Sequence, residues 1–127
     1  MSRNINIFVQ TDEDENVFVS KLEGELGIQF EVKHNSFGTL YSFFDSNYRW
    51  CEVGKHSLVN DRNMLFENYQ YQIEIGVSNS GSATEREQAL LEYAKTIFDR
   101  LRATRLYRIM LVEDVQIKID EYDPASG

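Results

Sequence analysis

The sequence feature that most constrains the fold is a strict alternation of apolar and polar residues over 69–77. The apolar positions are Tyr69, Tyr71, Ile73, Ile75 and Val77, and the polar positions between them include Gln70, Gln72 and Glu74. Because successive side chains of a β-strand point to opposite faces of a sheet, the pattern predicts a strand with one packed face and one face in water. Such strands are typical of antiparallel sheets, whose apolar face needs a second layer to cover it.

Two amphipathic segments can supply that layer. Residues 83–104 carry an apolar stripe at helical spacing, formed by Leu90, Ala94, Ile97, Phe98 and Leu101. Ser82 and Glu85 have the spacing of a capping box, which satisfies backbone amides that the first helical turn leaves unpaired. A shorter helix is predicted to start after Thr11 or Asp12, and Gly27 is predicted to end it because glycine readily adopts the left-handed conformation.

Further strands are predicted from shorter alternations and apolar runs at 4–10, 28–32, 40–44, 48–53 and 107–112. Residues 54–68 are polar and mixed, which predicts a loop with a short helical turn. Two interpretations of the last segment stay open: 115–122 alternates like a strand, but a short acidic helix could start at 113 or 114. We therefore expect one α+β domain over 1–123, followed by a frayed tail at 124–127. Its antiparallel or mixed sheet would have about five strands, with two helices packed on one face.

The charge of the chain restricts its partners. Its 127 residues carry a formal net charge of -8, which disfavours contact with nucleic acids and with anionic membrane surfaces. The same field attracts a basic protein, although an acidic composition also serves solubility alone.

Cys51 is the only cysteine, so no internal disulfide can form, and 109–112 is far too short an aliphatic run to span a bilayer. We expect a cytoplasmic protein.

No catalytic or metal-binding motif is apparent. His34 and His56 are far apart in the sequence, and only one cysteine could join them as a ligand, so no metal site is predicted. Cys51 lies beside Trp50 in an aromatic strand, where a thiol is usually buried and inert. Glycine-rich phosphate loops and nucleophile motifs are missing from the sequence. We expect neither a cofactor nor enzymatic activity, although a pair of carboxylates brought together by the fold would escape this search.

Basic residues gather near the end of the long predicted helix: Lys95, Arg100, Arg102, Arg105 and Arg108. Cations at a helix C-terminus are stabilised by the helix dipole, which explains the cluster without a function. The functional interpretation is a weak anion-binding patch formed by Arg102, Arg105 and Arg108.

The predicted strands in the middle of the chain are rich in aromatic residues. The group consists of Tyr41, Phe43, Phe44, Tyr48, Trp50, Tyr69 and Tyr71. One sheet face must pack under the helices, and alternation places some aromatics, either Tyr48 and Trp50 or Tyr41 and Phe43, on the other face. Exposed Tyr and Trp rimmed by carboxylates are typical of a protein-binding hot spot. The candidate partner-binding residues are Tyr48, Trp50, Tyr71, Asp45, Glu52 and Glu74. The alternative is that both faces are core.

In length, acidity and single-domain α+β layout, the chain resembles the small bacterial immunity proteins of polymorphic and contact-dependent toxin systems. Residues 95–101 followed by 107–113 have the helix-then-strand ending of some of these proteins. The resemblance implies an inhibitor that occludes the active cleft of a basic toxin domain. The alternative from another class is a structural or regulatory domain of phage or mobile-element origin that self-associates as a homodimer.

Overall fold

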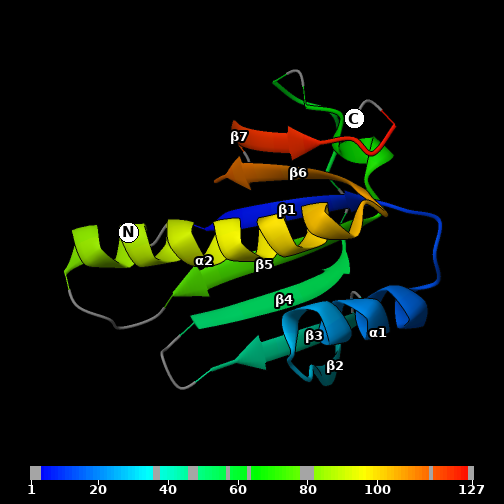
Figure 1. The fold of residues 1–127 in the computed structure, drawn as a ribbon, viewed down its shortest axis with the longest axis horizontal. Helices are drawn as coiled ribbons and strands as arrows, with labels where there is room; N and C mark the ends of the chain where they lie inside the picture. The colour runs from blue at the N-terminus through cyan, green and yellow to red at the C-terminus, as the bar shows by residue number, and fades with distance from the viewer. Residues whose placement is uncertain are drawn as a thin grey trace.

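The computed structural model describes residues 4–35, 38–45, 49–56, 58–62, 64–77, 82–114 and 116–125. Its strands are β1 (Ile5–Gln10), β2 (Glu31–Asn35), β3 (Gly38–Phe44), β4 (Arg49–Lys55), β5 (Tyr71–Val77), β6 (Arg108–Glu113) and β7 (Ile117–Tyr122). The helices are α1 (Glu15–Leu26), α2 (Ala83–Thr104) and a short 3-10 helix, η1 (Phe66–Asn68). The strands form one antiparallel sheet in the order β2-β3-β4-β5-β1-β6-β7 (Figure 1).

The α+β class, with two helices and a single sheet, is confirmed. The expected number of about five strands is wrong, because the described residues form seven. The segment with two open interpretations is a strand, β7, which pairs with β6 through a register shift between Leu111 and Val112. Ile28 and Phe30 pack against the core before β2 begins, so that strand lies three residues further along the chain than expected.

The long helix begins and ends where its sequence predicts. Ser82 Oγ accepts a hydrogen bond of 3.2 Å from the backbone amide of Glu85, and Arg105 ends the helix in the left-handed conformation. Helix α1 starts at Glu15, later than expected, after a turn in which Thr11 Oγ1 accepts a hydrogen bond from the backbone amide of Glu13. Gly27 ends α1 with φ 66°, as predicted.

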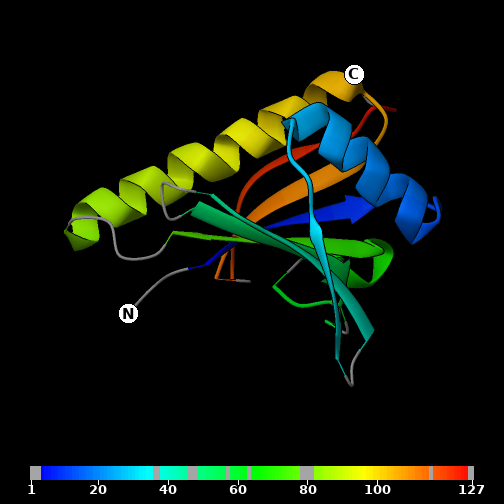
Figure 2. The same cartoon turned by 90° about the horizontal axis from the view of Figure 1, so that it is seen from below.

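Both helices cover the same side of the sheet, which we call the helix face (Figure 2). The main core lies there, between the helix stripes and alternate residues of the strands. Its fully buried side chains include Ile7, Ile73, Ile75, Phe18, Phe98 and Leu111. No helix in the described ranges is long and apolar enough to cross a membrane.

The other side of the sheet carries a second, smaller core. Its buried members are Phe8, Met64, Phe66, Tyr69, Met110 and Val112, with Leu58 packed against them. The segment between β4 and β5 therefore does more than the loop expected for 54–68. It covers β1 and β6 on the side opposite the helices, because Leu58, Met64 and Phe66 provide apolar side chains within a mostly polar stretch. Beside this covered area, the same side of β3, β4 and β5 carries no further layer among the residues described.

Candidate functional site

The candidate site is this uncovered area of β3, β4 and β5, which we call the open face. The pairing register sets its rows: Phe44 opposes Trp50, which opposes Gly76, and in the next row Ser42 opposes Glu52, which opposes Glu74. A third row contains Leu40, Gly54 and Gln72. The open face thus has an aromatic row, an acidic row and a mixed row.

Trp50 lies directly against the backbone of Gly76. A Cβ atom built on Gly76 would lie 2.2 Å from Trp50 Cζ2, so only glycine leaves room for the indole in this position. Phe44, on the neighbouring strand, is 60% exposed. Together the two side chains give the open face an aromatic corner of the kind that anchors protein interfaces.

Glu52 and Glu74 are directly opposed on adjacent strands. Partial burial and then the charge of Glu52 raise the pKa of Glu74 above its ordinary value. Like charges placed opposite each other in a sheet are destabilising, so this pair costs stability unless a cation lies over it. A cavity of about 160 Å³ adjoins the pair, lined also by Leu40, Lys55 and Gln72.

The polar row continues into the covered part of the sheet. Asn6 on β1 pairs in register with Glu74 and is only 1% exposed. Its Oδ1 accepts a hydrogen bond of 2.7 Å from Gln72 Nε2. Because the bond satisfies the buried amide and holds the Gln72 side chain, it fixes one wall of the cavity beside the carboxylates.

The structure brings three of the predicted binding residues together: Trp50, Glu52 and Glu74 share the open face. Asp45 follows β3 and lies on the helix face, where its carboxylate is bonded to Arg49. Tyr48 lies outside the described residues.

The prediction that Tyr71 is an exposed anchor is wrong. Its side chain is 4% exposed on the helix face, where the ring stacks on Phe18 and the hydroxyl donates to the Glu13 carbonyl. Tyr71 and Glu74 are three residues apart on one strand, so alternation alone already places them on opposite faces. Tyr41 is also buried under the helices.

Phe44 and Leu40 are the open-face residues that the candidate list missed. Phe44 could have been found from the hairpin between β3 and β4, since it pairs with Trp50 across that hairpin. Leu40 has the same alternation as Phe44 on β3, and its Cδ2 covers Gly54.

The three arginines predicted as an anion-binding patch do not all lie on one side of the sheet. Arg102, on α2, places its guanidinium 5.6 Å from the centre of the Tyr122 ring, and Arg105 caps the helix. Arg108 alternates with Ile109 on β6 and therefore projects from the other side of the sheet, where it contacts Tyr69. The sheet separates Arg108 from Arg102.

Both histidines have structural partners. His56 Nε2 donates to the Tyr69 carbonyl at 2.6 Å, and its Nδ1 accepts from the amide of Leu58. His34, on the edge strand β2, contacts Thr39. Within the described part of the chain, no three His, Cys, Asp or Glu residues are grouped so that they could hold a metal ion.

The chain was compared with known protein families, curated proteins and solved structures. Nothing matches it. The geometry of the open face is therefore the basis for assigning a function.

Proposed function

We propose that the chain is a non-catalytic protein-binding domain that inhibits a basic partner, as immunity proteins inhibit toxins, by placing the open face over the partner's active cleft. The observation that carries the proposal is the position of Trp50 and Phe44 beside the opposed carboxylates of Glu52 and Glu74 on an uncovered sheet face. Aromatic anchors beside charges form the usual core of a protein interface.

The electrostatics of the chain favour a basic partner. A net charge of -8 accelerates encounter with a positively charged cleft, and the effect falls as salt is added. At close range, an arginine or lysine of the partner would relieve the repulsion between Glu52 and Glu74 that exists in the free protein. Binding of a cation at this pair would therefore lower the pKa of Glu74 and release protons at mildly acidic pH.

The proposal is tested by capture with matched variants. The tagged domain is incubated with lysate of its source organism at moderate salt, and the retained proteins are identified by mass spectrometry. Glu74→Lys reverses one charge of the open face, while Glu92→Lys makes the same change at an exposed position of α2. We expect one basic protein to be retained by the wild type and by Glu92→Lys, and to be lost with Glu74→Lys and Trp50→Ala.

The captured protein is then purified and assayed for its own activity with added domain. Stoichiometric inhibition by the wild type, and an affinity loss of about 2 kcal/mol for Glu74→Lys, would support occlusion by the open face. Equal retention of the same proteins by the wild type and by both open-face variants would refute it, provided that circular dichroism shows the variants to be folded.

Self-association is the second candidate, and the outer strand β2 favours it. Val32 is 52% exposed on this edge and is flanked by Glu31 and Lys33. If β2 pairs with β2 of a second copy in antiparallel register centred on Val32, each Glu31 opposes Lys33 of the copy. A mass that rises with concentration in sedimentation, and falls to the monomer value in Lys33→Glu, would favour this candidate.

A further inference from the structure

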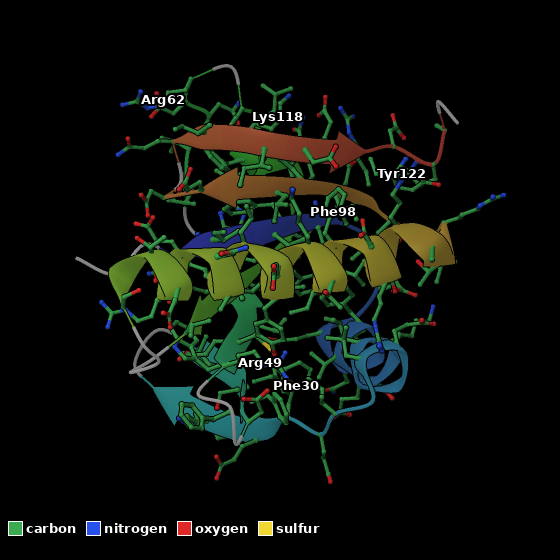
Figure 3. All side chains as sticks on the ribbon, turned by 60° about the vertical axis from the view of Figure 1, so that its left-hand side comes forward. Phe30, Arg49, Arg62, Phe98, Lys118 and Tyr122 are labelled. Atoms are coloured by element: carbon green, nitrogen blue, oxygen red, sulfur yellow. The ribbon has the colours of Figure 1, made fainter. Side chains whose placement is uncertain are left out.

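A cavity of about 260 Å³ opens on the helix face, on the opposite side of the sheet from the open face. It lies between the C-terminal end of α1, the middle of α2 and the adjoining ends of β3 and β4. Ile28 and Phe43 belong to its apolar wall, and Arg49, Arg100, Asp45 and Tyr93 are its main polar lining. Figure 3 shows Arg49 on the side of the sheet that carries the helices, between α2 and the strands below it.

The Arg49 side chain is held in a fixed orientation. Its Nε donates to Asp45 Oδ2 at 2.8 Å, and its backbone amide donates to Asp45 Oδ1 at 2.9 Å. The guanidinium carbon lies 4.8 Å from the centre of the Tyr93 ring, so the planar group also rests on an aromatic face. The bond to Asp45 uses Nε, whereas the two terminal nitrogens carry the other four N–H donors of a guanidinium.

Arg100 brings a second guanidinium to the same cavity. Its Nη1 donates to the Glu25 carbonyl near the end of α1, at 3.1 Å, which ties the two helices together beside the opening. Two arginines and one aspartate in the lining give a local formal charge of +2 − 1 = +1, in a chain whose net charge is -8. The cavity is therefore locally positive, whereas Glu52 and Glu74 make the open face negative.

Two further ionisable groups lie close to Arg49, the Cys51 thiol and the Tyr93 hydroxyl, and neither adds negative charge. Burial raises the pKa of the Cys51 thiol to about 12, and burial likewise raises the pKa of the Tyr93 hydroxyl, so both are neutral near pH 7. A preformed cavity with apolar walls and a few convergent polar groups is the usual form of a small-molecule site.

We propose that this cavity binds a small organic carboxylate with an apolar body, whose carboxylate meets Arg49 and Arg100 and whose body packs on Ile28 and Phe43. Arginine is the residue best suited to a planar carboxylate, because the two groups match in bidentate geometry. If each non-hydrogen atom of a ligand takes about the 30 Å³ of a water molecule, the cavity of about 260 Å³ suits a ligand of roughly nine such atoms.

Benzoate, with about nine non-hydrogen atoms, is the probe, and benzamide and benzylamine are its neutral and cationic counterparts. Each is titrated into the isotope-labelled full chain while the methyl resonances of Ile28 and Ile97 are followed. We expect benzoate to shift these methyl groups with a Kd on the order of 1–10 mM, the range that so small a ligand reaches. Benzamide should bind at least about fivefold more weakly, since it cannot form charge-assisted bonds with arginine. Equal binding of benzoate and benzylamine would overturn the proposal.

Variants distinguish the contribution of the arginine charge to benzoate binding from that of the cavity shape. Arg100→Gln removes a cation from the cavity, whereas Arg102→Gln makes the same change on α2 outside its lining. We expect a loss of benzoate affinity of about fivefold or more for Arg100→Gln and no loss for Arg102→Gln. Thr96→Trp, at an exposed position of the cavity lining, should abolish binding by filling the space. Equal affinities in the wild type, Arg100→Gln and Thr96→Trp would show that benzoate binds elsewhere, which would also overturn the proposal.

Discussion

Replacement of Gly76 by alanine should destabilise the protein through a single neighbour, Trp50. The new Cβ would lie 2.2 Å from Trp50 Cζ2 and 2.3 Å from Cε2. Carbon atoms in contact normally lie about 3.5–4.0 Å apart, so the indole must move by more than about 1 Å or rotate off the sheet. Gly76 is not among the residues with positive φ, so its backbone conformation itself accepts a side chain.

The size of the effect follows from two opposing contributions. Overpacking of this kind costs about 1–3 kcal/mol. Alanine in place of a strand glycine restricts the unfolded chain, which stabilises the folded protein by about 0.5–1 kcal/mol. Gly76→Ala should therefore lower the free energy of unfolding by about 1–2 kcal/mol in the wild type. In a Trp50→Ala background the clash is absent, and the same substitution should stabilise the protein by about 0.5 kcal/mol.

Urea denaturation of the four proteins in this double-mutant cycle measures the coupling between the two positions. Gly54→Ala is a useful comparison on the next strand, since its nearest neighbour is the flexible end of Leu40, at 2.7 Å, and its cost should be smaller. If Gly76→Ala changed stability equally with and without Trp50, the indole would not lie over Gly76, and the described surface of the open face would be wrong.

Three further predictions concern ionisable groups. The pKa of Glu74 is raised above 4.5 in the folded protein, so the folded state binds a proton here more tightly than the unfolded state does. The stability gained from this proton is fully present below pH 4.5 and is lost as the pH rises through the folded pKa. Glu74→Gln should remove this loss and be more stabilising at pH 7 than at pH 4 in urea titrations; an equal effect at both pH values would contradict it. Cys51, with its pKa raised to about 12 by burial, should resist iodoacetamide at pH 8 until urea unfolds the chain, as followed by mass spectrometry. Rapid labelling of the native protein would count against the buried thiol. The Tyr107 hydroxyl donates to the Glu13 carboxylate, so Tyr107→Phe should cost about 1.5 kcal/mol in urea denaturation, and an unchanged midpoint would show that the bond contributes nothing.

The elements with strong local signals were predictable from the sequence. The observed ends of α2 agree with the predicted ones, because a capping box marks its start and an apolar stripe at helical spacing follows along the helix. The alternation of β5 likewise fixes which of its side chains face the helices, so Glu74 was correctly placed on the other face. Trp50 and Glu52 are two residues apart on β4, so alternation alone places them on the same face of the sheet. Both side chains are partly exposed there, and Trp50 lies across Gly76 on the neighbouring strand.

The remaining features depend on contacts between distant parts of the chain. The second core could not be predicted, because Phe8 and Met110 meet Met64 and Phe66 only after the segment between β4 and β5 folds over the sheet. The cavity at Arg49 escaped prediction for a similar reason, since its lining comes from four separate elements. Local patterns contain no information on such pairings.

The place of β1 in the sheet has a consequence for how the chain folds. This first strand is a central one, and its two partners, β5 and β6, begin at Tyr71 and Arg108. During synthesis β1 must therefore remain unpaired, with its apolar residues Ile5, Ile7 and Val9 exposed, until β5 has been made. Closing these long loops before β1 gains a partner slows folding, so this small domain should fold more slowly than its length alone suggests. The unpaired N-terminal strand is then the segment most in need of protection in a nascent chain.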